Sequence, residues 1–526
     1  MRTCTRGRPR GRPEEGVGRM VSQRQLIVLA SALLAILAGP PLTPATSQGR
    51  PVVVMQGVEP LGLDASITTG IFSLNPALHI LEPLVDFDEK LRIIPRLATA
   101  WKWVNPTTFE LTLRPGVKFH DGTPFGAVDV KFTFDRILDA KNRSDFRRYF
   151  SERTVKEVQA TGERTVRFVL TEPRPVFLRT LTQVGITPQK AVTEMGAERF
   201  NRAPVGTGPY RIREWASGVR ITMTANRDYW GGNPRIPELV WRWVSEDATR
   251  VAELLSGNAD IITGLPPDLV KQVDENATAR VASVRSLRTA FILINTKKPP
   301  FNDVRVRKAL NHAVNVQSII DNLMGGFAER VPTVMGPFVA GYNPRLKPFA
   351  YDPETARKLL AEAGHPGGFT ANFFAFRGRL LKDRELSEAV TAHLQRIGIN
   401  LRLQFLDFAV VFGMTQRYNR DVDLMLWSNA NNNADASYNL ELNFYSKGRG
   451  TYWSDPKVDE LIESAATEVD ETRRERTYQE ILRLITEVHV PVVFLYDQKD
   501  LYGVSRRLEW EPRADERINL WRAFAR

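Results

Sequence analysis

The sequence predicts an α/β protein of two or three domains. Its 526 residues exceed what one hydrophobic core usually serves. Hydrophobic residues make up 43% of the chain and charged residues 25%, close to globular averages, which excludes a disordered, collagenous or integral membrane protein. Strand and helix patterns alternate after residue 50. This alternation favours α/β lobes with largely parallel sheets, in which ligands bind in crevices beyond the strand ends.

The N-terminal segment is typical of a secretory signal peptide. Arg24 precedes a thirteen-residue, largely apolar run from Leu26 to Ala38, and Ala45-Thr46-Ser47 places small residues before a cleavage site at Gln48. Thirteen helical residues span only about 20 Å, which is short of the ~30 Å hydrocarbon core of a membrane. We therefore expect residues 1–47 to be removed during export, together with Cys4, the only cysteine.

The composition also excludes several kinds of site. One cysteine and six histidines argue against a disulfide scaffold, an iron–sulfur cluster and a zinc centre, so we expect no metal and no cofactor. The net charge of +12 falls to +7 without residues 1–47, and that excess is spread over 479 residues without a basic block. We therefore expect no nucleic-acid partner.

Three elements are predicted in the first half of the mature chain. Apolar and polar residues alternate over 109–113, which predicts a half-buried strand. Apolar residues then recur at helical spacing over 130–138. The segments 155–160 and 165–170 flank a short turn and predict a hairpin.

Helix ends are marked more clearly in the second half. Asp352-Pro353 and Asp455-Pro456 each place a capping aspartate before a proline suited to the first helical position. Ser245 is expected to cap another helix. A fourth helix is predicted over 384–397, followed at once by an alternating strand over 399–405.

A set of short motifs resembles one known family. In chain order they are Leu81-Glu82-Pro83-Leu84-Val85, the stretch 114–125 (RPGVKFHDGTPF), Gly206-Thr207-Gly208-Pro209-Tyr210, Pro300-Phe301 ahead of 304–310, and 359–364 (LLAEAG). Each motif alone is weak, but the ordered set resembles the extracytoplasmic solute-binding proteins of family 5, the oligopeptide- and dipeptide-binding group of ABC importers. The resemblance covers nearly the whole mature chain.

The resemblance implies a type II periplasmic-binding-protein fold, in which two lobes joined by a hinge carry an inserted third domain. Residues 48–85, 205–287 and 497–526 would form the first lobe, 86–204 the inserted domain and 288–496 the second lobe, with the hinge near 287–295 and 492–497. Such a protein is a periplasmic monomer. It closes on a small solute between its lobes and delivers it to an inner-membrane ABC permease, without catalysis.

The resemblance also indicates a candidate site. Peptide-binding members carry Trp-x-x-Asp in a loop that faces the cleft, and the aspartate pairs with the α-amino group of the ligand. The matching loop here, expected over 427–435 after an apolar strand over 422–426, begins at Trp427 and has Ala430 in place of the aspartate. An unpaired buried ammonium is costly, which argues against a free-amine peptide unless Asp435 replaces the missing carboxylate.

Neutral polar residues fill the rest of this loop. Ser428, Asn429 and Asn431 offer hydrogen-bond donors and acceptors, so we expect a ligand-binding cleft that is mostly uncharged. The alternative is that an asparagine-rich stretch is a solvated turn.

Four further residues are candidates for the cleft. Arg377 follows a strand predicted over 369–376, Tyr496 lies at the second crossing, and Thr69 and Phe72 follow the first strand. The alternative for each is a purely structural role. Gly206 to Tyr210 is expected to lead into a strand and not to cradle phosphate, since no helix opens there.

The contrasting hypothesis is an exported hydrolase acting on peptides or esters. The sequence contains no Gly-x-Ser-x-Gly elbow, no His-Glu-x-x-His, no Walker motif and no cysteine nucleophile after residue 47. No nucleophile with a positioned base is evident, so we expect no catalytic residues.

Overall fold

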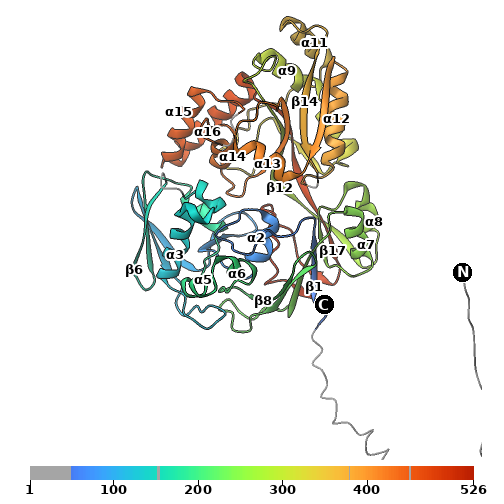
Figure 1. Ribbon diagram of the computed structural model, residues 1–526. Coiled ribbons are helices and arrows are strands. Elements are labelled where there is room, and N and C mark those ends of the chain that lie inside the picture. The colour runs from blue at the N-terminus through green and yellow to red at the C-terminus, as the bar shows by residue number, and fades with distance from the viewer. Residues whose placement is uncertain (1–48, 151–153, 378, 449–451) are drawn as a thin grey trace, which may run out of the picture. The chain divides into compact units, whose positions relative to one another are not determined.

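A computed structural model describes residues 49–150, 154–377, 379–448 and 452–526 (Figure 1). Residues Arg50–Arg526 form one compact unit. The predicted signal peptide over 1–47 lies outside the described residues. None of the helices within the described ranges has the length and apolarity needed to cross a membrane.

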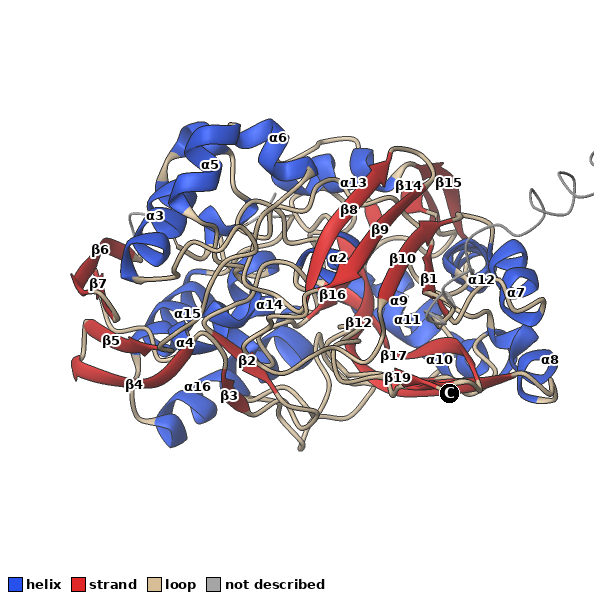
Figure 2. Ribbon diagram, turned by 90° about the horizontal axis from the view of Figure 1, so that it is seen from below, coloured by secondary structure: helices blue, strands red, loops and turns tan. Residues whose placement is uncertain are grey.

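A mixed sheet organises most of this unit. Within the described ranges it has eleven strands in the order β15-β14-β16-β12-β17-β11-β1-β10-β9-β8, with β13 paired to β17. Figure 2 shows β8, β9, β10 and β1 side by side. The bounds are β1 Val52–Gln56, β8 Tyr210–Ala216, β9 Arg220–Ala225, β10 Glu238–Trp243, β11 Ile261–Thr263, β12 Ala279–Ile294, β13 Ala328–Arg330, β14 Phe369–Phe376, β15 Ile399–Leu406, β16 Leu424–Ala430 and β17 Val492–Ser505.

The prediction of largely parallel sheets is wrong. β1 pairs in parallel with β10 and β11, and β14 with β15 and β16, but the remaining pairs of this sheet are antiparallel. Two causes are visible: β8, β9 and β10 follow one another as hairpins, and β12 and β17 run past each other in opposite directions. Alternating strands and helices predicted parallel pairing, but they carry no information on strands that cross between halves of a sheet.

The two long strands β12 and β17 hold the sheet together. Residues 279–285 of β12 pair with 499–505 of β17, on the side of β11 and β1, whereas 289–293 pair with 492–497, on the side of β16 and β14. The register shifts between Arg285 and Thr289. Figure 1 shows both strands passing between the upper and lower groups of elements. The hinge predicted near 287–295 and 492–497 falls on this crossing, and its motion stays a prediction.

Helices cover both halves of the sheet. Those near β1 and β11 are α2 Ile71–Ala77, α7 Asp247–Leu255 and α8 Val270–Asp274, and those of the second half are α9 Val304–Ala313, α10 Val316–Ser318, α11 Pro353–Glu362, α12 Asp383–Gln395, α13 Phe408–Gln416, α14 Ala436–Asn443, α15 Pro456–Thr467 and α16 Glu471–Arg483. The predicted caps Asp352 and Asp455 are confirmed, since each carboxylate accepts a backbone N–H of its helix. Ser245 is not a cap: α7 begins after Glu246, and the Ser245 carbonyl accepts from Arg250 Nη1 at 3.1 Å.

Residues between β1 and β8 contain a separate antiparallel sheet. Its order is β4-β5-β7-β6, with bounds β4 Ala98–Asn105, β5 Thr108–Leu113, β6 Val155–Gly162 and β7 Thr165–Leu170, so the strand and hairpin predicted here are confirmed. The predicted helix is α3 Ala127–Leu138, and short elements complete the region: β2 Val85–Phe87, β3 Ile93–Pro95, α4 Phe177–Thr180, α5 Gln189–Met195 and α6 Ala197–Arg202. Another small sheet pairs β18 Leu508–Glu509 with β19 Phe524–Ala525.

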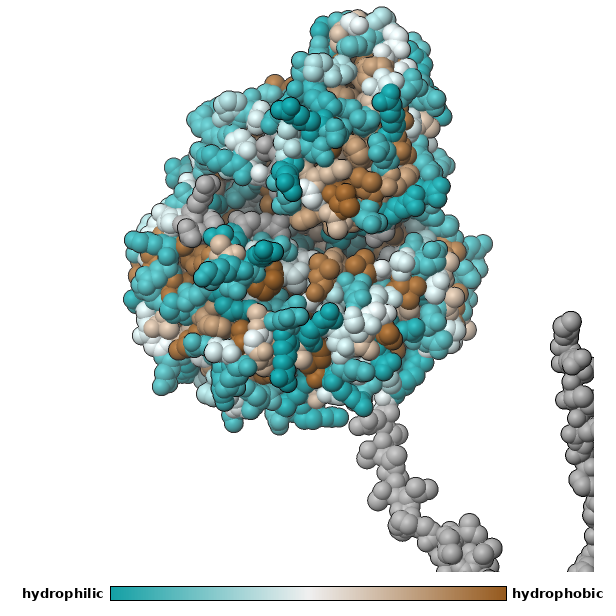
Figure 3. Space-filling view, in the orientation of Figure 1, coloured by the Kyte–Doolittle hydropathy of each residue, from teal (hydrophilic) through white to brown (hydrophobic). Residues whose placement is uncertain are grey.

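Buried apolar side chains form three clusters. One lies within 84–186 and includes Phe109, Phe134 and Phe168. A second packs β1, β8, β9 and β10 around Trp241, and the third packs the second half of the sheet around Trp427. The third cluster extends to Met55 and Val251 near β1, so buried contacts continue through the crossing. The predicted domain boundaries stay a prediction. The face of the molecule seen in Figure 3 is mostly hydrophilic, with hydrophobic residues interspersed.

The motif Gly206 to Tyr210 lies where two backbone segments pack directly against each other. Tyr210 begins β8 as expected, and Gly208 N donates to the Ile80 carbonyl at 2.9 Å. A Cβ atom on Gly206 would lie 1.9 Å from that carbonyl oxygen, and one on Gly208 would lie 2.4 Å from the His79 oxygen. The glycines are needed because two backbone segments touch here.

We expect Gly206→Ala to destabilise the protein by about 1–3 kcal/mol, since backbone must move to admit the methyl group. Gly413→Ala is the control, because Gly413 is exposed in helix α13 with no atom within 4 Å of its Cβ position. There alanine should stabilise by up to about 1 kcal/mol. Urea denaturation measures both changes, and equal stabilities would contradict the account.

Candidate functional site

A buried ion pair lies where β12 changes register. Arg288 of β12 donates from Nε and Nη2 to the two carboxylate oxygens of Glu516, both at 2.7 Å, and from Nη1 to Ser428 Oγ at 3.2 Å. The side chains are 3% and 10% exposed. A bidentate geometry of this kind is what makes a buried pair tolerable.

The C-terminal segment positions Glu516. The residue has a left-handed backbone with φ of 61°, and its carbonyl accepts from Asn75 Nδ2 at 3.2 Å. The next residue, Arg517, donates to Asp86 at 2.9 Å and to the Thr182 carbonyl at 2.7 Å. The segment therefore ties Arg288 to residues near α2 and to the region of the small sheet.

Asp500 of β17 is a second buried carboxylate beside this pair. Its Oδ1 accepts from Gln498 Nε2 at 2.9 Å, and Oδ2 has no hydrogen-bond partner among the described residues. Burial and the nearby Glu516 together raise the pKa of Asp500 to about 7, against the opposing charge of Arg288. An unpartnered buried carboxylate oxygen is available to a ligand donor.

Arg379 is a cation without an anion. It follows β14 and is half-buried, and among the described residues no carboxylate lies within ion-pair distance of it. Its guanidinium lies 5.4 Å from the centre of the Phe408 ring. Burial lowers the pKa of Arg379 to about 10, and the charge of Arg288 lowers it too, whereas Glu516, Tyr438 and Asp500 raise it. Arg379 thus belongs electrostatically to the same cluster.

Aromatic rings form one wall of this cluster. Trp427 of β16 stacks on Phe408 and Phe412 of α13, with ring centres 6.2 and 6.4 Å apart. Trp427 Nε1 donates to Asn429 Oδ1 at 3.0 Å. This bond fixes the Asn429 amide, whose Nδ2 is buried and has no acceptor within the described part of the chain. We call Arg288, Arg379, Ser428, Asn429, Asp500 and Glu516 the polar cluster.

Three residues predicted from the sequence adjoin or belong to the polar cluster. Ser428 and Asn429 are members, and Trp427 holds Asn429. The expected loop over 427–435 is wrong at its start, however, because β16 continues to Ala430, and Trp427 is a core residue at 2% exposure. The expectation of a mostly uncharged cleft stays a prediction, although the polar cluster itself contains four ionisable residues, Arg288, Arg379, Asp500 and Glu516.

Asn431 and Asp435 serve the backbone. Asn431 Nδ2 donates to the Asp435 carbonyl at 2.9 Å, and the Asp435 carboxylate caps α14 by accepting from Ser437 N at 3.0 Å. Arg474 lies 3.7 Å from the other oxygen of Asp435. The cap uses Oδ1, whereas Oδ2 is buried and has no hydrogen-bond partner among the described residues, so a ligand-binding role for Asp435 stays a prediction.

The remaining candidates lie in different places. Tyr496 is fully buried and points its hydroxyl at Met324 Sδ, 3.9 Å away, and burial raises its pKa far above the usual range. Arg377 is exposed over the Phe405 ring at 4.8 Å. Thr69 approaches Asp145 at 3.4 Å, and Phe72 is half-buried in α2. A ligand-binding role for these four stays a prediction.

Sequence reasoning missed Arg288, Arg379, Asp500 and Glu516. Arg288 and Asp500 lie in polar stretches of β12 and β17, among Arg285, Ser286 and Thr289 and after Asp497, Gln498 and Lys499, so the sequence pattern does not single them out. Glu516 lies in irregular chain and Arg379 in a polar turn, and no periodicity marks either. The described residues contain no group of His, Cys, Asp and Glu side chains suited to a metal ion.

Comparison with known proteins agrees with this architecture. The family model for bacterial extracellular solute-binding proteins, family 5 Middle, matches residues 92–451. The glutathione-binding protein GsiB of Pectobacterium atrosepticum is 27% identical over 504 residues, covering 93% of this chain and 96% of that protein. A putative ABC transporter peptide-binding protein of Brucella ovis is 30% identical over 460 residues, covering 82% and 84%.

A solved structure is similar as well. MoaA of A. tumefaciens R10, in complex with mannopinic acid, superposes with a TM-score of 0.80 at 26% identity, covering 91% of this chain and all of that one. The mixed α/β fold is that of the periplasmic solute-binding proteins. The chain belongs to the bacterial extracellular solute-binding proteins of family 5. It is the substrate-binding component of an ABC importer for peptides or other small solutes and not an enzyme, which excludes the hydrolase alternative.

Asp500 predicts a pH dependence of stability. Its pKa is raised to about 7 in the folded state and is about 4 in the unfolded chain, so the folded protein binds the extra proton and loses stability as the pH rises from 4 to 7. We expect Asp500→Asn to stabilise the ligand-free protein at pH 8, with the gain shrinking towards pH 4. Urea denaturation at several pH values measures this, with the exposed Asp421→Asn as control; a gain independent of pH would contradict it.

Proposed function

We propose that this protein captures a small carboxylate-bearing solute at the polar cluster and delivers it to an inner-membrane ABC permease. The observation that carries the proposal is Arg379, a half-buried guanidinium that has no carboxylate partner among the described residues. A desolvated guanidinium favours an anion, and its planar fork matches a carboxylate. The unpartnered Asn429 Nδ2 supplies a further donor.

The relatives support this ligand class. Glutathione, peptides and mannopinic acid, which appear in the names of the similar proteins, all bear carboxylates. The other groups of these ligands differ. The carboxylate is the feature common to all of them, and it is the group that Arg379 would bind.

An amino group on the solute would pair with Asp500. Ala430 supplies no carboxylate, and Asp435 caps α14 through Oδ1 while Arg474 lies 3.7 Å from its Oδ2. Asp500 Oδ2 is the buried acceptor left over in the polar cluster, and a ligand ammonium would hold Asp500 in its ionised form. The presence of alanine in place of aspartate at position 430 therefore does not exclude a zwitterionic ligand such as a peptide.

The transport cycle follows from the crossing strands. After export and cleavage near Ser47, the periplasmic protein acts as a monomer and has no nucleic-acid partner. The solute binds first to one lobe. The lobes then turn about β12 and β17 until both contact the ligand, because closure is favoured only by contacts made in the closed state.

Thermal-shift measurements on the mature protein test the ligand class. The panel is glutathione, an opine acid, a dipeptide and the same dipeptide with a C-terminal carboxamide. We expect at least one carboxylate ligand to stabilise the protein according to RT ln(1 + [L]/Kd). The carboxamide should bind far more weakly, because it leaves Arg379 unpaired.

Arg379→Ala should then cost about 2–5 kcal/mol of binding free energy, as expected for a buried charge pair that loses one partner. Arg384→Ala is the control, since Arg384 is exposed on α12 and pairs with Glu388. Unchanged affinity in Arg379→Ala, or equal affinity for acid and carboxamide, would overturn the assignment.

A further inference from the structure

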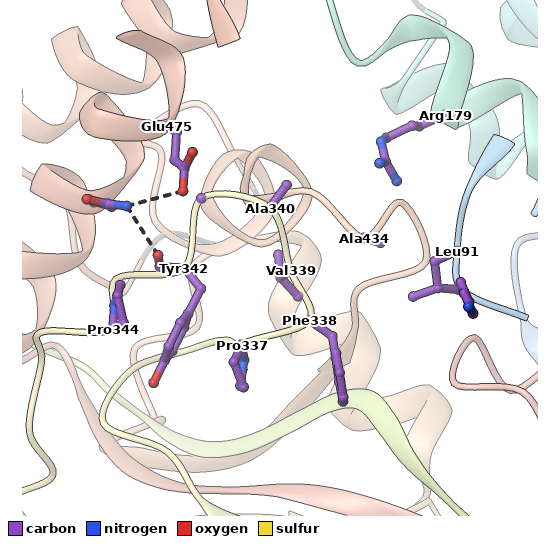
Figure 4. A pocket seen from close by; sticks show the side chains of 13 residues that line it. Leu91, Arg179, Pro337, Phe338, Val339, Ala340, Tyr342, Pro344, Ala434 and Glu475 are labelled. Atoms are coloured by element: carbon purple, nitrogen blue, oxygen red, sulfur yellow. Dashed lines mark hydrogen bonds between the residues drawn. The ribbon is translucent and has the colours of Figure 1, made fainter. Parts of the chain in front are cut away.

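An open pocket of about 550 Å³ lies apart from the polar cluster. In Figure 4, Arg179 and Leu91 reach it from one side, and the segment Pro337 to Tyr342 and Glu475 from the other. The first side belongs to the region of the small sheet and the second to the second half of the main sheet. Its volume is in the range of small-molecule sites, and of the described residues that line it none is a member of the polar cluster.

One wall of the pocket is cationic. Lys90 and Arg179 both line it, and within the described ranges neither has a carboxylate at ion-pair distance. Arg179 Nη1 donates to the Asn433 carbonyl at 3.3 Å, which anchors the guanidinium at the pocket. Burial lowers the pKa of Arg179, whereas the charges of Asp435 and Glu471 raise it. Arg179 is half-buried and Lys90 is exposed, and two cations on one wall favour an anionic group between them.

The rest of the pocket is largely apolar. Phe338 is 56% exposed although it is a large aromatic residue, and Leu91 and Tyr342 are half-buried beside it. The carboxylate at the far side, Glu475, accepts from Gln479 Nε2 at 3.3 Å. A ligand would therefore place its anionic end at the cationic wall and its apolar body against Phe338 and Leu91.

Backbone strain supports a binding role. Leu91 has φ of 59° and Ala434 has φ of 50°, and both line this pocket. A bulky residue in the left-handed region is a conformational outlier, and such outliers cluster at functional sites. The turn at Leu91 is held by Asp88, whose carbonyl accepts from Leu91 N at 3.0 Å and whose N–H donates to the Arg92 carbonyl at 2.9 Å. The Leu91 side chain packs against the hydrophobic cluster of the second half of the sheet and also lines the pocket.

We propose that this pocket is a second ligand site, specific for a small apolar monocarboxylate such as an aryl or branched acyl acid. Its carboxylate binds Lys90 and Arg179, and its apolar body packs on Leu91 and Phe338. Because the two walls come from different regions of the fold, an occupied pocket holds these regions together. This site is separate from the solute site proposed above.

Isothermal titration calorimetry with phenylacetate tests the proposal, with phenethylamine and benzyl alcohol as the cationic and neutral matches. We expect saturable binding of phenylacetate alone. Lys90→Gln combined with Arg179→Gln should weaken it at least tenfold. Binding of all three probes alike, or unchanged affinity in the double variant, would overturn the site.

Leu91→Gly separates binding from folding. Glycine adopts the left-handed conformation without strain, which offsets part of the packing lost with the leucine side chain. The variant should therefore stay folded while phenylacetate affinity falls at least threefold; unchanged affinity in this folded variant would contradict the proposal. Arg379→Ala distinguishes the two sites, because it should retain phenylacetate binding while losing the transported solute. Loss of phenylacetate binding in Arg379→Ala would show that the acid occupies the polar cluster instead.

Discussion

The antiparallel pairing of β12 with β17 is the constraint on which the rest of the structure depends. These strands pair along most of their length, yet their two ends belong to different halves of the sheet. Backbone hydrogen bonds must be satisfied through the crossing, so the register shift between Arg285 and Thr289 is confined to a few residues. Arg288 lies within that shift, and its charge obliges the C-terminal segment to return with Glu516. The polar cluster is thus a product of the same feature that joins the halves.

Local structure was predictable from sequence wherever a short-range cause sufficed. The aspartate–proline starts at Asp352 and Asp455 and the alternation over 109–113 predicted helices and a strand that the structure contains. Ser245 is not the cap because α7 begins one residue later, after Glu246, whose carbonyl accepts from Arg250 N. Strand direction failed for a different reason, since pairing across the crossing depends on residues some two hundred positions apart. The ordered family motifs supplied what periodicity could not.

Only some residues of the candidate site could be predicted from the sequence. Ser428 and Asn429 were found because a family motif led to them, and Asn431 and Asp435 were included because they are polar neighbours in the chain. Their amide and carboxylate groups are used by the backbone at the start of α14, which no pattern of residue types reveals. Arg379 and Glu516 interact electrostatically although they lie 137 positions apart in the sequence (516 − 379), and neither has a local signal. A charged residue whose partner lies far away in the sequence can be identified as part of the site only from the three-dimensional structure.

The C-terminal segment has a consequence for biosynthesis. Residues 516–520 contact Arg288, Asp86, Asn75 and His79, all of which are synthesised at least 228 residues earlier. Arg288 therefore has no carboxylate partner of this kind until Glu516 has been synthesised. The crossing of β12 and β17 cannot reach its final packing before residues 516–520 have left the ribosome.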